Sequence, residues 1–392
     1  MSLYKKCENF TDAKEIQKLG FYPYFRVISS DQDTEVLVDG KKTLMLGSNS
    51  YLGLTNHPKV IEAAVQATRK YGTGCAGSRF LNGTLDIHLE LEEKLADFVG
   101  KEASMTYSTG FQANLGSIGT FVGRGEYIIT DRYDHASIID ASRLSYGKML
   151  RYNHNDMDSL EQVLKKVENA SKLIVIDGIF SMEGDIANLP KIVELAEKYN
   201  AEIMVDDAHS IGVLGKNGSG TADHFGVTDK IDLIMGTFSK SFASIGGFIA
   251  GNNSVIHYLK HFSRPFVFSA SLPPASAASV IAALEIMKNE PERIERLWEI
   301  TRKMQNGFKD MGYDIGVSCT PIIPLHVGEM MKAFRMWKML ADENVFINPV
   351  IPPAVPPTDC LIRTSFMATH TDRQLDESLE KFEKIGKKLN II

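Results

Sequence analysis

The chain has 392 residues and a formal net charge of −6, so it carries no basic footprint for nucleic acid or for an anionic membrane surface. A chain of this length folds as two domains or as one large α/β domain with appendages. The sequence has no apolar run of transmembrane length and no signal-peptide core at its start. Its four cysteines are scattered and form no CxxC pair, so we expect reduced thiols, no metal site and a cytoplasmic location.

The first part of the chain, residues 1–47, reads as an N-terminal arm. It contains a predicted helix over residues 12–19 and an alternating stretch in which Asp39-Gly40 is typical of a hairpin turn. A helix is expected to begin at Pro58, and a glycine-rich loop follows at 72–84. The next predicted helix, residues 85–100, has its leucines on or near one face: Leu85, Leu89, Leu91 and Leu95.

From about residue 103 the pattern becomes strand, loop, helix, repeated. Near-continuous apolar strands that alternate with amphipathic helices indicate a mostly parallel sheet covered by helices on both faces. We therefore predict an α/β fold with a seven-stranded sheet. The expected strands are SMTYS (104–108), YIIT (127–130), KMLRY (148–152), KLIVID (172–177), EIMVDD (202–207), DLIMG (232–236) and GFIAG (247–251).

After Pro273-Pro274 the chain turns helical again and then alternates between strand and helix patterns. This change indicates a smaller α+β domain at the C-terminal end. We therefore expect an N-terminal arm at 1–47, a large domain at 48–275 and a small domain at 276–392.

Lys240 lies in the glycine-rich loop between two apolar runs, in the stretch LIMGTFSKSFASIGGFIAG. A lysine among small residues between buried strands loses its charge at modest cost and can act as a nucleophile. Thr237 and Ser239 beside it can bind a phosphate. An amine next to a phosphate site is what a Schiff base to pyridoxal 5′-phosphate (PLP) requires. The alternative for Lys240 is an ordinary solvated lysine in a surface loop.

Ligands bind at the carboxyl ends of the strands in an open parallel sheet, and unusual residues follow five of the predicted strands. The first of these strand ends leads into a helix at Gly110-Phe111, whose free N–H groups suit a phosphate. His135 could stack on a planar cofactor, although a histidine at a helix start is more often a cap. Further strand ends carry Ser181, Asp206, Asp207, His209, Thr237 and Ser239.

Asp206 and Asp207 end an otherwise apolar strand, where a carboxylate is costly unless a cation holds it ionised. A protonated pyridine nitrogen is such a cation, and its pairing makes PLP a stronger electron sink. The alternation of side chains along a strand favours Asp206 for this place. A turn or helix cap suits Asp207 better.

Five ordered motifs, STGFQANLG, DHASIIDASR, FSMEGD, VDDAHSIGVLG and GTFSK, resemble the α-oxoamine synthases, PLP enzymes of the aminotransferase superfamily. The resemblance extends from about Ser48 to His370. It implies the PLP-dependent transferase fold, as in aspartate aminotransferase. It also implies a homodimer with its active sites at the subunit interface.

By this resemblance, Lys240 would be the catalytic Schiff-base lysine and His135 the catalytic residue stacked on the cofactor ring. Asp206 would face the pyridine nitrogen and His209 the ring oxygen. The residues implied around the phosphate are Gly110, Phe111, Ser181, Thr237, Ser239 and Ser269, the last contributed by the partner subunit.

The resemblance also implies the substrate contacts. Arg363 in LIRTSF would bind the substrate carboxylate, for which a planar guanidinium is well suited. Asn49 in SNSYLG would be a second contact. Arg79 and the glycines of the loop at 72–84 would line the subunit interface near the site.

Within the family, the runs GSRFLNGT and GTFSKSFASIGGFIAG most resemble members that condense L-serine with a long-chain acyl-CoA such as palmitoyl-CoA. This implies a PLP-dependent acyltransferase of lipid metabolism that forms 3-oxosphinganine in the first step of sphingolipid synthesis. Two alternatives stay open: a sister enzyme that uses alanine or glycine, and a non-catalytic subunit that scaffolds an active partner. Lys240 argues against the scaffold, but residue chemistry alone does not select serine over alanine.

Overall fold

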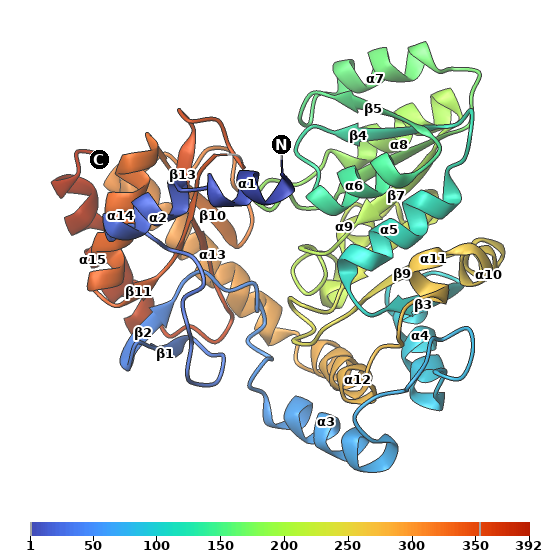
Figure 1. Ribbon diagram of the computed structural model, residues 1–392, viewed down its shortest axis with the longest axis horizontal. Coiled ribbons are helices and arrows are strands. Elements are labelled where there is room, and N and C mark those ends of the chain that lie inside the picture. Colours follow the sequence, from blue (N-terminus) through green and yellow to red (C-terminus); the bar gives the residue numbers. More distant parts are fainter. Residues whose placement is uncertain (1, 353) are drawn as a thin grey trace.

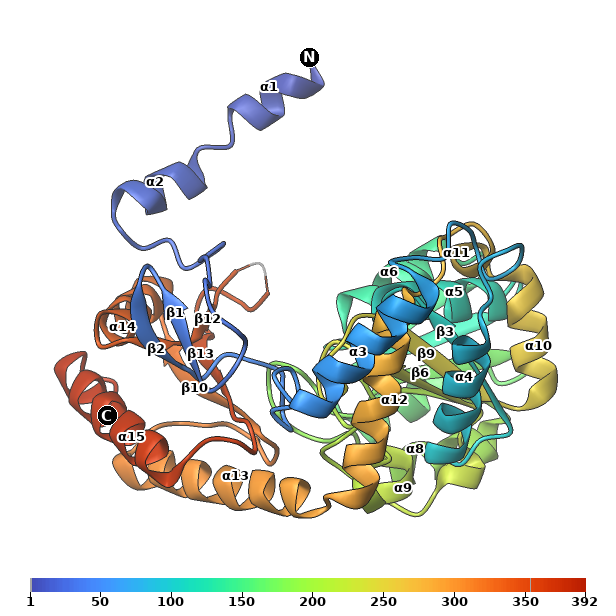
Figure 2. The ribbon, with the colours of Figure 1, turned by 90° about the horizontal axis from the view of Figure 1, so that it is seen from below.

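The computed structural model describes residues 2–352 and 354–392. A large α/β region and a smaller region with its own sheets lie side by side in Figure 1, joined through the long helix α13 (Glu292–Met311). The N-terminal helices α1 (Leu3–Glu8) and α2 (Asp12–Lys18) extend away from both regions (Figure 2). Within the described residues, no helix is both long enough and apolar enough to cross a membrane.

The large region is built on a seven-stranded sheet, as predicted. Its strands follow the spatial order β3-β9-β8-β7-β6-β4-β5, and all neighbours are parallel except β9, which is antiparallel to both β3 and β8. The parallel strands β4, β6, β7 and β8 therefore have their carboxyl ends at one edge. The strands are β3 (Ala103–Tyr107), β4 (Tyr127–Asp131), β5 (Lys148–Tyr152), β6 (Lys172–Asp177), β7 (Glu202–Asp206), β8 (Leu233–Thr237) and β9 (Gly247–Gly251).

Helices cover both faces of this sheet because its strands are apolar on both sides. Along β6, Leu173 and Val175 pack with α5, α6 and α10, whereas Ile174 and Ile176 pack in the core that includes α4, α7, α8 and α12. The helices of this region are α3 (Pro58–Tyr71), α4 (Asp86–Phe98), α5 (Gly110–Phe121), α6 (Ala136–Leu144), α7 (Met157–Lys166), α8 (Leu189–Tyr199), α9 (Thr221–His224), α10 (Asn253–Phe262), α11 (Arg264–Val267) and α12 (Pro274–Asn289), with short 3₁₀ turns at Lys216–Gly218 and Thr228–Lys230.

The smaller region packs three helices around two small sheets. In the sheet β10-β13-β12, strand β13 is central and antiparallel to both neighbours. The second sheet has the order β1-β2-β11. Besides α13, the elements of this part are β10 (Ile322–Gly328), α14 (Met330–Asp342), β11 (Val345–Phe346), β12 (Asn348–Val350), β13 (Cys360–Ser365) and α15 (Asp372–Lys388).

Strands β1 (Glu35–Val38) and β2 (Lys41–Met45) form the hairpin predicted in the N-terminal arm. Asp39 and Gly40 have φ values of 50° and 73°, as a two-residue hairpin turn requires. Strand β2 also pairs in parallel with β11, so this hairpin joins the C-terminal region. The division at residues 47 and 275 remains our proposal, and this pairing associates part of the arm with the small domain.

The segment after β2 runs along β13 and connects the two regions at the site. The backbone N–H of Ser365 donates to Leu46 O at 2.9 Å, and its hydroxyl donates to Ser48 O at 2.7 Å. The N–H of Ala368 donates to Tyr51 O at 2.7 Å. These bonds fix the chain around Asn49 beside the last residues of β13.

Helix α4 differs from its prediction in the face that it buries. Leu91 and Leu95 are fully buried, but Leu89 is 54% exposed. His88 and Glu92 occupy the buried face in its place, where each has polar partners. The prediction from the leucine spacing was wrong at Leu89. A pattern of apolar residues cannot reveal that this face buries polar side chains.

Candidate active site

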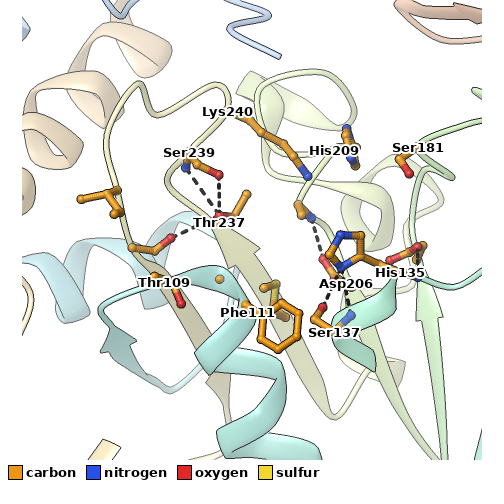
Figure 3. A pocket seen from close by; sticks show the side chains of 16 residues that line it. Thr109, Phe111, His135, Ser137, Ser181, Asp206, His209, Thr237, Ser239 and Lys240 are labelled. Carbon is orange, nitrogen blue, oxygen red and sulfur yellow. Dashed lines mark hydrogen bonds between the residues drawn. The ribbon is translucent and has the colours of Figure 1, made fainter. Parts of the chain in front are cut away.

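A cavity of about 360 Å³ lies at the carboxyl edge of the large sheet (Figure 3). Its walls come from the segments that follow β3, β4, β6, β7 and β8, at the edge where open α/β sheets bind ligands. Of the residues predicted from the sequence, those that line it are Gly110, Phe111, His135, Ser181, Asp206, His209, Thr237, Ser239 and Lys240. Asn49, Ser269 and Arg363 are not part of its lining.

Lys240 follows the end of β8 and extends into the pocket (Figure 3). The loop turns tightly behind it, where Ala243 N donates to Lys240 O at 2.9 Å. Burial lowers the pKa of the Lys240 amine to about 8, although the carboxylates of Asp206 and Asp177 act in the opposite direction. Part of the population is therefore the free amine at neutral pH, the nucleophilic form.

Asp206 ends β7 with its carboxylate in the pocket and only 3% of the residue exposed. Its Oδ2 accepts a hydrogen bond from Asn114 Nδ2 at 2.7 Å, and its Oδ1 accepts one from Ala208 N at 3.0 Å. Both donors are neutral, so they orient the carboxylate without neutralising its charge. This arrangement suits a cationic nitrogen of a bound ligand.

Asp207 points to the other side of the strand, as the alternation along β7 predicts. Its Oδ2 accepts a hydrogen bond from the backbone of Thr221, the first residue of α9, at 3.0 Å. Burial raises the pKa of the Asp207 carboxyl to about 6, although the hydrogen bond from the Thr221 backbone opposes this. Asp207 therefore anchors a neighbouring helix and does not line the pocket.

His135 is both a helix cap and a wall of the pocket, so the two interpretations of this residue are compatible. Its Nδ1 accepts a hydrogen bond from Ser137 N at 3.2 Å at the start of α6, and its own backbone N–H donates to Asp177 Oδ2 at 2.9 Å. Burial lowers the pKa of the His135 ring, which favours the neutral form. The ring faces the pocket between Asp206 and Ser181 in Figure 3.

His209 is oriented by Tyr51, a residue that the sequence analysis did not single out. The Tyr51 hydroxyl lies 2.7 Å from His209 Nδ1. Burial raises the pKa of Tyr51 to about 12, and burial together with the cationic Lys240 holds the pKa of His209 well below its usual value. A neutral His209 can present its second ring nitrogen to a ligand oxygen.

One end of the pocket is suited to a phosphate. Thr109 caps α5 by accepting from Gln112 N at 3.1 Å, and the N–H groups of Gly110 and Phe111 lie in the first turn, where they have no intrahelical partner. The hydroxyls of Thr237 and Ser239 lie 3.0 Å apart beside this helix end. A Cβ at Gly110 would approach Thr237 Oγ1 to 2.7 Å, so the close contact needs glycine.

The two serines predicted near the phosphate lie elsewhere. Ser181 is at the opposite end of the pocket from Thr237 and Ser239, beside His209 and His135 (Figure 3). Ser269 is outside the pocket, and its hydroxyl accepts from Gln112 Nε2 at 3.2 Å. A phosphate contact by Ser181 within this chain is therefore disfavoured by its position, and Ser269 does not line the pocket of its own chain.

Arg363, in the central strand β13 of the small sheet, approaches the pocket from the C-terminal region. The residue is 6% exposed. Its Nε donates to Ser181 O at 2.6 Å, and its NH2 group donates to Asn49 Oδ1 at 3.0 Å. The structure thus brings Arg363 and Asn49 together at the Ser181 end of the pocket, although they are far apart in the sequence.

Three further residues of this environment were missed in the sequence: Tyr51, Asn114 and Asp177. Asn114 is fully buried in α5 and donates to both Asp206 and Ser137. Its signal in the sequence was an amide side chain one helical turn after Gly110, at the start of α5. Asp177 ends β6 directly beside Asp206 in the strand register, and both line the pocket.

Arg79 does not point outward from the glycine-rich loop. Its NH1 group lies 2.7 Å from Glu92 Oε1 and 3.0 Å from Thr106 Oγ1, and both ion-pair side chains are 5% exposed. The guanidinium is directed inward because Glu92 is a buried carboxylate that needs a cationic partner. Any contact of this loop with a partner subunit would therefore not use the Arg79 guanidinium.

The residues of the pocket fit PLP. The carboxylate of Asp206 is oriented but not neutralised by its neighbours, the helix end at Gly110 offers unpaired N–H groups, and Lys240 supplies a buried amine. These three features match the pyridinium nitrogen, the phosphate and the aldehyde of this cofactor.

A family model described as "Aminotransferase class I and II" matches residues 41–382, and the chain belongs to this family. The serine palmitoyltransferase of Sphingobacterium spiritivorum is 57% identical over 390 residues, covering 99% of this chain and 98% of that protein. The 8-amino-7-oxononanoate synthase of Thermoanaerobacter pseudethanolicus is 45% identical, covering 97% of this chain and 96% of that protein.

Among solved structures, a serine palmitoyltransferase from S. paucimobilis with a bound PLP–myriocin aldimine has a TM-score of 0.97. It is 35% identical in sequence, with 100% of each chain covered. The predicted family resemblance and the PLP-dependent transferase fold are confirmed by these matches.

Proposed function

We propose that this chain catalyses the serine palmitoyltransferase reaction, the first step of sphingolipid synthesis. A bond forms between Cα of L-serine and the thioester carbonyl carbon of palmitoyl-CoA or another long-chain acyl-CoA. Coenzyme A leaves, the serine carboxylate leaves as CO₂, and the product is 3-oxosphinganine. The observation that carries this choice of substrate is the 57% identity to a serine palmitoyltransferase, against 45% to a synthase of the same family.

We propose that PLP binds in the pocket, where it would stabilise the electron pair released at Cα of the amino acid. Lys240 would hold it covalently through the side-chain amine, and Asp206 would pair with its ring nitrogen. His135 would lie against the ring face, and His209 would bond the ring oxygen. The phosphate would be bound by Gly110, Phe111, Thr237 and Ser239.

In this proposal Lys240 would move the proton at Cα. It is buried, and burial lowers its pKa to about 8, which suits a general base near neutral pH. Arg363 would bind the serine carboxylate in the plane of its guanidinium, with Asn49 beside it. This clamp would fix which bond at Cα stands perpendicular to the cofactor ring.

We also propose a cytoplasmic homodimer. Ser269 and the glycine-rich loop at 72–84 lie outside the pocket of their own chain, and a second chain could bring them to the site. A dimer would complete the phosphate end that Gly110 begins.

The test is an amino-acid titration of the PLP-loaded protein, followed by condensation assays. We expect serine to change the cofactor absorption spectrum and to support release of coenzyme A from palmitoyl-CoA. A response to alanine or glycine but not to serine would assign the chain to a sister activity, 8-amino-7-oxononanoate synthase or 2-amino-3-ketobutyrate ligase. A protein that binds no PLP would be a non-catalytic scaffold.

A further inference from the structure

His154, just beyond the edge strand β5, makes contacts that none of the proposed roles uses. Its Nδ1 lies 3.1 Å from Asp131 Oδ1, and its Nε2 lies 3.2 Å from Asp185 Oδ2. The ring stacks on Tyr133 with the centroids 4.5 Å apart and packs edge-on against Phe180 at 4.4 Å. Only 19% of the side chain is exposed. One imidazole thus joins the segment after β4 to the loop after β6.

Contacts within the loop after β6 connect His154 to Arg363. Asp185 O accepts a hydrogen bond from Phe180 N at 3.1 Å, which closes the loop around Ser181. His154 contacts both ends of this closure, and the carbonyl of Ser181 accepts from Arg363 Nε at 2.6 Å. The position of that carbonyl, and with it the plane of the guanidinium, depends on how firmly the loop is held.

A series of hydrogen bonds in the segment after β4 connects His154 to His135. Asp131 accepts from Tyr133 N at 2.8 Å through the oxygen that faces His154. Asp134 then bonds the backbone of both Asp131 and Asp177, and Asp177 accepts from His135 N. The turn that presents His135 to the pocket is therefore tied to the same imidazole.

The charge balance of this region also depends on His154. Asp131, Asp134, Asp177 and Asp185 are all at most 7% exposed. Burial by itself lowers the pKa of His154, but the hydrogen bond to Asp131 and the ion pair with Asp185 outweigh it and raise the pKa to about 10. The imidazole is therefore cationic at neutral pH, and its loss would leave two buried carboxylates without this partner.

We propose that His154 is a positioning residue for the serine-carboxylate site. By joining Asp131 to Asp185, it fixes the Ser181 carbonyl, which orients Arg363. It also fixes the turn that carries His135. This inference rests on the proposed function, in which Arg363 binds the serine carboxylate. His154 itself touches neither the cofactor nor the substrate.

The test compares His154→Gln with a matched control, His88→Gln. His88 is also a buried histidine with two partners, Leu85 N at 3.1 Å and Leu272 O at 2.8 Å, but it is not part of this network. The dissociation constant of serine is measured from the spectrum of the PLP-loaded protein. We expect about a tenfold increase for His154→Gln, because a small misplacement of a clamp is costly, and less than a twofold change for His88→Gln.

A double-mutant cycle with Arg363→Ala separates positioning from a general loss of structure. If His154 acts through Arg363, His154→Gln changes serine binding by less than twofold in the Arg363→Ala background. In the apoprotein, hydrogen exchange should rise in segments 131–135 and 180–186 of His154→Gln but not of His88→Gln.

An unchanged serine dissociation constant, or an equal increase in both Arg363 backgrounds, would overturn the proposal. If His154→Gln does not fold, Asp185→Asn removes the same link and is scored by the same two criteria. A wild-type protein that binds PLP but not serine would instead contradict the proposed function, so the two failures are distinguishable.

Discussion

Two parts of the candidate active site are built in different ways. The strand-end wall, formed by His135, Asp206, Thr237 and Lys240, comes from the ends of the parallel strands β4, β7 and β8 of one sheet. The Arg363 corner, formed by Arg363, Asn49 and the Ser181 carbonyl, brings together the small sheet, the segment after β2 and a loop of the large sheet. The wall depends on one rigid element, whereas the corner depends on how separate elements meet.

This difference suggests a division of labour. A sheet edge holds its residues in fixed register, which suits a tightly bound cofactor that remains through the reaction cycle. A corner assembled from three elements can adjust to a substrate that must enter and leave. Damage to the wall should therefore affect chemistry, and damage to the corner should affect serine binding.

The largest effect is expected from Lys240→Ala, which removes the group that we propose as covalent anchor and proton-transferring group of the wall. Turnover should fall by about 10⁴-fold or more, while the fold remains intact and PLP binds weakly through its phosphate. Release of coenzyme A in a PLP-saturated sample measures this. Condensation at a rate near that of the wild type would show that Lys240 does not have the proposed role.

Asp206→Asn is expected to have the next largest effect. An amide cannot hold the proton of the ring nitrogen, so exchange of the serine Cα proton with D₂O should slow by about 10²-fold or more, with PLP still bound. Asp207→Asn is the matched control and should mainly change thermal stability, because Asp207 bonds Thr221 outside the pocket. The opposite pattern would show that the two aspartates have been assigned wrongly.

Arg363→Ala tests the corner. Removal of one partner of a buried charge pair costs about 3–5 kcal/mol, so serine binding should weaken by roughly two orders of magnitude or more while PLP content is unchanged. Arg363→Lys should recover only part of this, because a point charge does not fix the carboxylate plane. If only the Michaelis constant for acyl-CoA rises, Arg363 contacts the thioester substrate instead.

The pH dependence of PLP binding to the apoprotein tests the lowered pKa of Lys240 in the strand-end wall. Lys240 reacts as the free amine, and burial lowers its pKa to about 8. The fraction of free amine therefore increases with pH, and the rate of covalent binding should rise roughly tenfold between pH 7 and pH 9 and then level off. A rate that continues to climb beyond pH 10 would indicate a lysine with an ordinary pKa.

The smallest effect is expected from Tyr51→Phe, which removes one hydrogen bond where the corner meets the wall. The Tyr51 hydroxyl lies 2.7 Å from His209 Nδ1, and a lost hydrogen bond is worth about 0.5–1.5 kcal/mol. We expect a decrease in kcat of about three- to tenfold with little change in PLP content. An unchanged kcat would mean that His209 is held by its packing alone.

The same comparison explains how far the sequence could predict the structure. The residues of the wall could be predicted because each of them lies at or after the end of an apolar strand, and parallel strands bring their ends together. The alternation along β7 was enough to separate Asp206 from Asp207. The seven strands of the sheet were found for the same reason.

Contacts between distant segments could not be predicted from the strand pattern. The pairing of Tyr51 with His209 and the inward ion pair of Arg79 with Glu92 depend on how helices and loops pack, which leaves no periodic signal. The solvent-facing Leu89 is the counterpart of that buried ion pair, because Glu92 occupies the face that the leucines were expected to share. The resemblance to a family supplied Arg363 and Asn49, which spacing alone could not connect.

The position of β13 after all the strands of the large sheet has a consequence for biosynthesis. All seven strands of the large sheet have been synthesised once the ribosome passes Gly251, long before Arg363 is added. A chain that stops before Cys360 contains every residue of the strand-end wall but lacks the guanidinium of the corner. Chains that stop before β13 would therefore carry the residues for cofactor capture without Arg363, and only a chain extended beyond Arg363 combines the two.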